Sequence, residues 1–146
     1  MAAQVCGLVV LAGCVAHPVG PARTFTTYEG KAVASAEAAQ SAVATVRLLA
    51  TTAAAGKTFG PYTVVALSEE EDGLSAVEGT FGSIQPPDRR ADTLRAELGA
   101  ILSSAVGHAA DVRIAARRGH LDGLDRVAAP LAGDAAALDR FLARHR

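Results

Sequence analysis

DRRADTLRAELGAILSSAVGHAADVRIAARR, residues 88–118, decides the fold of this 146-residue chain. Apolar side chains recur in it at spacings of three and four residues, which places them on one face of an α-helix. Gln85-Pro86-Pro87 precedes the stretch and Gly119 follows it. Three arginines near its end suit the negative pole of a helix dipole. We therefore predict a helix over about 88–118 whose buried stripe is Leu94, Leu98, Ile101, Ala105, His108, Val112 and Ala115.

Three other stretches repeat this periodicity, over about 28–55, 61–84 and 121–143. Hydrophobic residues make up 50% of the chain, with much alanine among them, and aromatic residues only 4%. That composition suits closely packed helices better than a β-sandwich or barrel, whose inner faces favour β-branched and aromatic residues. Short loops between such helices favour antiparallel neighbours. The predicted fold class is all-α, an up-down-up-down four-helix bundle over residues 27–146.

Local signals mark the ends of these helices. Thr26 or Thr27 can cap the first helix, because a threonine hydroxyl accepts from an unpaired N–H of the first turn. Gly56 is placed to end that helix, since glycine tolerates the left-handed conformation. Pro130 lies inside the fourth stretch and removes one helical hydrogen bond, which predicts a kink or a short break.

The second helix carries an acidic run, Glu69-Glu70-Glu71-Asp72. Consecutive carboxylates point around a helix, whereas calcium and magnesium sites need converging oxygens, so we interpret the run as a solvated face. Counting residues outward from the first turn places Arg47 level with Glu70. We predict a surface ion pair between Arg47 and either Glu70 or Glu71.

Leu11-Ala12-Gly13-Cys14 follows an apolar run that starts at Val5. A run of about eight residues fits a signal sequence, because a membrane-spanning helix needs about 20. A tripeptide of small residues before a cysteine at this place resembles the lipobox of bacterial lipoproteins. The chain also resembles small uncharacterised lipoproteins of high-GC bacteria. The resemblance implies a diacylglyceryl group on the Cys14 thiol, cleavage before Cys14 and further acylation of the new amine.

On this interpretation residues 1–13 form the signal peptide and residues 14–26 form the lipidated cysteine and a flexible tether rich in proline and glycine. Met1-Ala2-Ala3-Gln4 lacks the basic residues of a signal n-region, so we expect the natural start to lie upstream. Two alternatives remain open. Cleavage near Val15-Ala16 would release the protein, and the cysteine could instead belong to an ordinary apolar N-terminus.

The remaining motifs favour no catalytic chemistry. A net charge of −1, from 14 basic and 15 acidic residues, gives no basis for nucleic-acid binding. Gly56-Lys57-Thr58 resembles the end of a phosphate-binding loop, but position 51, where that loop needs glycine, is Thr51.

Ser103-Ser104 lie one turn before His108, with no sign of an oxyanion hole or a nucleophile elbow. Helix hydroxyls usually bond their own backbone. His108 and Asp111 share a helical face, but a metal site needs three or four converging ligands. We expect no metal, no cofactor and a half-buried His108 with a polar partner.

The expected function is therefore that of a non-enzymatic lipoprotein on the extracytoplasmic face of the cell membrane. Its partners would be the membrane, through the lipid on Cys14, and envelope proteins, with the bundle as an interaction or envelope-assembly module. A first alternative is a bundle that binds a small apolar or amphipathic ligand between helices, beside Phe81 and His108, where glycines of the second helix could open a gap. A second alternative is a metal-binding bundle in which His108 meets ligands from a neighbouring helix.

Overall fold

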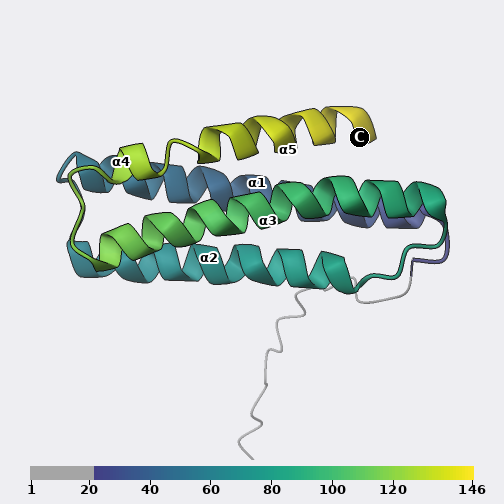
Figure 1. The fold of residues 1–146 in the computed structure, drawn as a ribbon, viewed down its shortest axis with the longest axis horizontal. Coiled ribbons are helices and arrows are strands. Elements are labelled where there is room, and N and C mark those ends of the chain that lie inside the picture. Colours follow the sequence, from purple (N-terminus) through teal and green to yellow (C-terminus); the bar gives the residue numbers. More distant parts are fainter. Residues whose placement is uncertain (1–21) are drawn as a thin grey trace, which may run out of the picture.

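The computed structural model describes residues 22–146, and the regular elements of this part of the chain are all helices, with no strand (Figure 1). Of the three long helices, α2 runs antiparallel to α1 and α3, which share one direction, and a fourth rod is divided into two helices. The predicted all-α, up-down-up-down bundle is confirmed. The helices of the described residues are α1 Phe25–Ala54, α2 Gly60–Ser83, α3 Arg89–Arg117, α4 Leu124–Val127 and α5 Leu131–His145.

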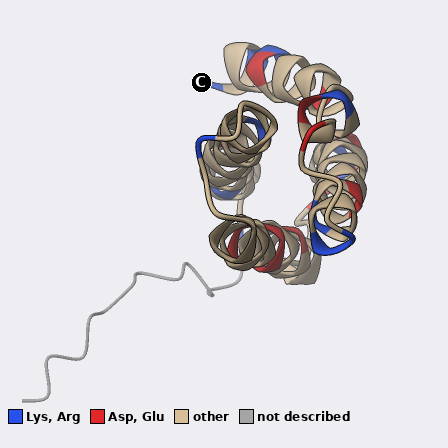
Figure 2. Ribbon diagram, turned by 90° about the vertical axis from the view of Figure 1, so that its left-hand side faces the viewer, with Lys and Arg blue, Asp and Glu red and all other residues tan. Residues whose placement is uncertain are grey.

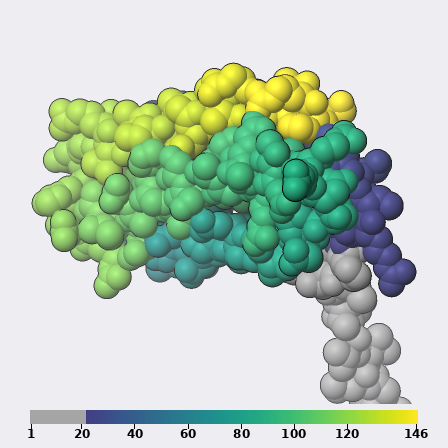
Figure 3. All heavy atoms as spheres, turned by 45° about the vertical axis from the view of Figure 1, so that its right-hand side comes forward, coloured from purple at the N-terminus to yellow at the C-terminus, as the bar shows by residue number. Residues whose placement is uncertain are grey.

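The four rods of the bundle form a flattened arrangement. α1 and α3 pack against each other through the centre, α2 lies along one side of this pair, and α4 and α5 lie along the other. In Figure 3, α3 separates α5 above it from α2 below it, and α2 makes no contact with α4 or α5. Alanine makes the close packing of α1 and α3 possible, because a side chain that ends at Cβ lets two helix backbones approach closely. Buried alanines of the central pair are Ala32, Ala36, Ala39, Ala50 and Ala53 of α1 and Ala91, Ala105, Ala109 and Ala116 of α3.

The first helix begins earlier than its sequence predicts. Thr24 is the N-cap, and its hydroxyl accepts from the Thr27 N–H at 3.2 Å, so the prediction of a cap at Thr26 or Thr27 is wrong. Residues 25 and 26, which we assigned to the tether, are helical, and Ala22 is buried against the bundle. The folded body therefore starts before residue 27, because a threonine three residues upstream supplies the capping oxygen.

Glycine ends α1 and α3 in the same way, as predicted from the sequence. Gly56 has a φ of +67° and Gly119 a φ of +80°, a left-handed conformation that side chains with a Cβ adopt only at a cost. The next N–H then turns back to a carbonyl of the last turn: Lys57 donates to Thr52 at 2.9 Å, and His120 donates to Ala115 at 3.1 Å. Both ends are Schellman motifs, which satisfy carbonyls that the helix leaves open.

The fourth rod shows the break expected at Pro130. α4 ends at Val127, Pro130 occupies the N-cap position of α5, and the Leu131 N–H bonds the Ala128 carbonyl at 3.1 Å across the turn. Proline cannot donate a hydrogen bond, so a continuous helix would lose one here. The break allows the axis of α5 to differ in direction from that of α4 where α5 packs along α1 and α3.

Candidate functional site

Asp134 is the centre of a polar cluster between α3 and α5. Its side chain lies in the first turn of α5, and the residue is only 6% exposed. Ser104 Oγ donates to one carboxylate oxygen at 2.7 Å, and His108 Nδ1 lies 2.6 Å from the other. Ser104 and His108 are four residues apart on α3, which places them on one face of that helix. The cluster therefore gives both oxygens of a buried carboxylate a partner and joins α5 to α3.

The order of the three groups in this cluster differs from that of a hydrolytic triad. In such a triad the histidine lies between serine and aspartate and takes the serine proton. Here the carboxylate lies between them, so the Ser104 hydroxyl gives its hydrogen bond to Asp134 rather than to His108. The prediction of a half-buried His108 with a polar partner is confirmed. Ser104 was expected to bond its own backbone, and the neighbouring helix supplies its acceptor instead.

Phe81 belongs to the core and faces Tyr28 of α1. The two ring centroids are 5.6 Å apart, and both side chains are almost completely buried. The residues predicted to share a ligand site thus serve different contacts, since Phe81 joins α2 to α1 and His108 joins α3 to α5. A Cβ built on Gly73, Gly79 or Gly82 of α2 would meet no atom within 4 Å, so these glycines face open space.

Tyr28 is a feature that sequence reasoning missed. Its hydroxyl is buried and has no hydrogen-bond partner among residues 22–146. Burial raises the pKa of Tyr28, the charge of Arg95 lowers it by a smaller amount, and Asp92 adds a further increase. No pattern in the sequence distinguishes this tyrosine from an ordinary residue at the start of a helix.

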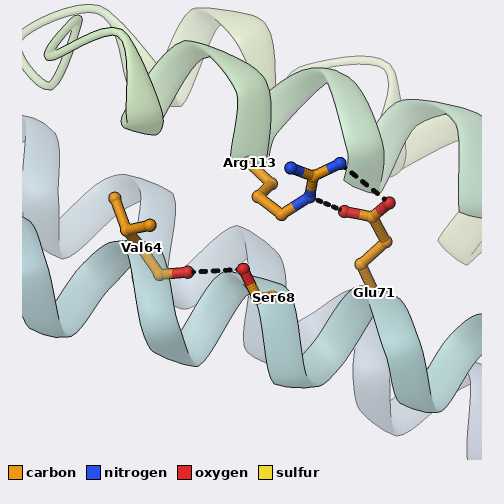
Figure 4. A network of polar contacts seen from close by, with 4 residues as sticks. All are labelled: Val64, Ser68, Glu71 and Arg113. Atoms are coloured by element: carbon orange, nitrogen blue, oxygen red, sulfur yellow. Dashed lines mark hydrogen bonds and ion pairs between the residues drawn. The ribbon is translucent and has the colours of Figure 1, made fainter.

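An arginine–glutamate pair links α2 to α3 (Figure 4). Arg113 donates from Nε to Glu71 Oε2 and from Nη2 to Glu71 Oε1, the latter at 3.2 Å, and both side chains are largely buried. The hydrogen bond to Glu71 raises the pKa of Arg113, and burial opposes this. The predicted pair of Arg47 with Glu70 or Glu71 is wrong for Glu71, because Glu71 faces α3 rather than α1. No ion pair of Arg47 with Glu70 forms either, and burial and the charge of Glu69 raise the pKa of Glu70.

Two hollows lie on the surface of the described bundle, at its opposite ends. One has a volume of about 260 Å³ and is lined by Phe25, Arg90, Thr93, Leu94, Glu97 and His145. The Arg90 guanidinium lies 3.9 Å from the centre of the Phe25 ring in a cation–π contact. The other hollow has a volume of about 300 Å³ and is formed by the last turns of α3, with Arg113, Ile114, Arg117 and Arg118 as its lining. The basic end of α3 faces the viewer in Figure 2.

The other predicted site residues contribute little to these features. Leu11, Ala12, Gly13 and Cys14 lie outside the described residues. Gly56-Lys57-Thr58 forms the turn between α1 and α2. Within residues 22–146, no three His, Cys, Asp or Glu side chains group closely enough to hold a metal ion, and no helix is both long and apolar enough to cross a membrane.

Comparison of the chain with models of protein families, with curated proteins and with solved structures finds no match.

Proposed function

We propose that this chain is a membrane-anchored, extracytoplasmic lipoprotein whose helical bundle acts as a non-catalytic interaction or envelope-assembly module. The observation that carries the proposal is Leu11-Ala12-Gly13-Cys14 directly after a short apolar run. Two or three acyl chains on Cys14 would give stable membrane binding, because one chain binds only marginally.

The contacts of the bundle support the non-catalytic part of this proposal. Ser104 and His108, the residues that come closest to a catalytic arrangement, are both bonded to the buried Asp134. The end of α5 is held by ion pairs as well. Arg144 pairs with Glu97 and Arg146 with Glu37 at 2.7 Å, and His145 Nδ1 makes a hydrogen bond of 3.0 Å with the Glu29 carboxylate. A bundle whose helices are joined by polar contacts of this kind suits a scaffold that presents its outer surface to partners.

The spacing between the lipobox and the bundle sets the geometry of attachment. Eight residues lead from Cys14 to Ala22, and eight residues can span at most about 29 Å. The lipid would therefore hold the end of the bundle where α1 begins close to the membrane. The lateral faces of the long helices would stay accessible to partners in the envelope.

Fractionation of cells that express the full chain tests the anchor. We expect the unsubstituted protein in the membrane pellet, labelled by a fatty-acid analogue, and Cys14→Ala in the soluble fraction without label. Cys6→Ala is the matched control, because Cys6 precedes the lipobox, and it should stay in the pellet. Retention of Cys14→Ala in the pellet would reject the proposal.

A second experiment tests the interaction part. The lipidated protein is captured from its native membrane after crosslinking, and the purified protein is analysed for metals and bound lipids. Reproducible capture of an envelope protein supports the proposed interaction module. A stoichiometric metal would favour the metal-binding alternative instead, and a co-purifying small ligand would favour the ligand-binding alternative.

A further inference from the structure

A hollow lies where the starts of α1 and α3 meet the end of α5. Phe25 of α1, Thr93 and Leu94 of α3 and His145 of α5 contribute to its walls, and its volume is about 260 Å³. That space equals about nine water molecules at about 30 Å³ each. Phe25 and Leu94 make part of the wall apolar. The hollow is therefore large enough for a small amphipathic group, such as a phosphate with the glycerol attached to it.

Arg90 gives this hollow a positive charge that no ion pair within residues 22–146 neutralises. Its guanidinium lies 3.9 Å from the centre of the Phe25 ring. The residues three and four positions away from it are two prolines on one side and Thr93 and Leu94 on the other, so no carboxylate of its own helix adjoins it on this face. Because Arg90 is exposed, its forked guanidinium can donate two parallel hydrogen bonds to a phosphate.

The carboxylates at this end of the bundle have other partners. Glu97 also lines the hollow and pairs with an arginine of α5, and Glu29 Oε1 lies 3.0 Å from His145 Nδ1. Asp88 is the N-cap of α3 and accepts from an N–H of the first turn at 2.9 Å. Asp92 lies three residues before an arginine on α3, so an opposite charge adjoins it. These contacts leave Arg90 as the charge with which an anion in the hollow would interact.

Two more arginines lie at the same end of the bundle. Arg23 precedes Phe25 by two residues and Arg89 directly precedes Arg90, and the contact of Arg90 with Phe25 brings the starts of α1 and α3 together (Figure 1). Both additional arginines are exposed, and neither forms an ion pair in the described part of the chain. This is also the end from which the chain leads to Cys14, over at most about 29 Å.

We propose that this hollow binds the phosphate of an anionic phospholipid in the membrane to which Cys14 is anchored. The phosphate accepts from the Arg90 guanidinium, and the glycerol lies against Phe25 and Leu94. A zwitterionic headgroup carries a cation of its own, which the arginines would repel, so an anionic headgroup fits better. The inference rests on the proposed function, because the lipid on Cys14 brings this end of the bundle to the membrane. A bound headgroup would hold the bundle end-on to the membrane.

Co-sedimentation of the purified full chain carrying Cys14→Ala with vesicles tests this contact without a lipid on the protein. Vesicles of equal parts phosphatidylglycerol and phosphatidylcholine are compared with phosphatidylcholine alone, so that binding through the apolar run before Cys14 affects both measurements. Each basic residue near an anionic surface strengthens binding about fivefold. Arg23→Gln/Arg89→Gln/Arg90→Gln should therefore lower the preference for anionic vesicles at least about tenfold. Circular dichroism verifies that the variant is folded.

Arg117→Gln/Arg118→Gln/Arg126→Gln is the matched control. It removes the same number of exposed arginines at the opposite end of the bundle, and none of the three forms an ion pair in the described part of the chain. We expect this variant to keep the preference for anionic vesicles. An equal loss in both triple variants, or no preference in the parent chain, would overturn the proposal.

A local probe shows which end of the bundle touches the lipid. The protein contains no tryptophan, so Phe25→Trp introduces a single reporter at the hollow. Brominated phosphatidylglycerol in the vesicles should quench its emission. Phe59→Trp is the matched control, because Phe59 is 84% exposed at the start of α2, at the other end of the bundle. Equal quenching of both variants, or none at Phe25→Trp, would contradict the proposal.

The vesicle experiments and the fractionation of cells can fail separately. Electrostatic contacts of this kind bind more weakly than two or three acyl chains, so Cys14→Ala is still expected in the soluble fraction. If Cys14→Ala leaves the membrane pellet but the purified chain shows no preference for anionic vesicles, this inference is overturned and the lipoprotein proposal stands.

Discussion

Asp134 of α5 and His108 of α3 are in direct contact, with the carboxylate oxygen Oδ2 2.6 Å from Nδ1 of the imidazole. The contact matters because Pro130 separates α5 from α4, so α5 depends on its own contacts for its position. The buried leucines of α5 supply the apolar part of its packing, and Asp134 supplies a buried, directional polar contact with α3.

Replacing Asp134 by alanine should therefore loosen α5. We expect Asp134→Ala to lower the free energy of unfolding by about 1–3 kcal/mol, because Ser104 and His108 lose their partner. Urea unfolding followed by circular dichroism measures this change. Asp139→Ala is the matched control on the same helix, since Asp139 is exposed and accepts a hydrogen bond from the exposed side of α1, from Gln40. The control should change the free energy of unfolding by less than about 0.5 kcal/mol. Equal costs at the two positions would show that the cluster does not hold α5.

The Arg113–Glu71 pair should couple α2 to α3 more strongly than an exposed pair couples its helices. A double-mutant cycle with Arg113→Gln and Glu71→Gln is expected to give a coupling free energy of about 1–2 kcal/mol, because the two-pronged contact is largely buried. The same cycle on Arg146 and Glu37, an exposed pair, should give about 0–0.5 kcal/mol. Thermal or urea unfolding of the four variants in each cycle provides the measurement. A coupling at Arg113–Glu71 no larger than at the exposed pair would refute this interpretation.

Periodicity and punctuation in the sequence predict most of the fold. Leu94, Leu98, Ala105 and Val112 of the predicted stripe are buried, and Gly119 ends α3 with a positive φ. The buried stripe is rotated about the helix axis from the predicted one. Leu102, Ala109 and Ala116 are buried, whereas Ile101, His108 and Ala115 of the predicted stripe are only partly buried. The spacing of apolar residues predicts a helix well, but it fixes the direction of the buried face only to within one neighbouring position.

Pairings between helices could not be predicted with the same success. A half-buried His108 with a polar partner was foreseen, but its partner Asp134 is 26 residues away, across a proline break. Counting levels places Arg47 beside Glu70, with Glu71 as a second candidate partner, whereas the position of Glu71 around the α2 axis directs it to Arg113. Residue counts predict how far along the bundle a side chain lies. The direction in which that side chain points from its helix depends on tertiary packing. The lipobox prediction at Cys14 lies outside the described residues and stays a prediction.

Tyr28 should make the folded protein less stable at high pH. Its buried hydroxyl has a pKa raised above the ordinary value of 10.0, mainly because burial disfavours the phenolate. Below pH 10 the phenol is neutral in both the folded and the unfolded state, so Tyr28 does not make the free energy of unfolding depend on pH. As the pH rises past 10.0, the unfolded chain releases this proton first, and the free energy of unfolding falls until the folded-state pKa is passed. Tyr28→Phe should remove this part of the alkaline destabilisation.

Tyr62→Phe supplies the matched control, because Tyr62 is the other tyrosine of the chain and is exposed. Urea unfolding from about pH 8 to about pH 11 compares the variants over the range in which tyrosine titrates. Near pH 8, Tyr28→Phe should be neutral or more stable by up to about 1 kcal/mol, since it removes an unpaired buried hydroxyl. Above pH 10 its advantage over the unsubstituted chain should grow, while Tyr62→Phe follows the unsubstituted chain. Parallel pH profiles for the two variants would mean that the Tyr28 phenol is not held neutral by its surroundings.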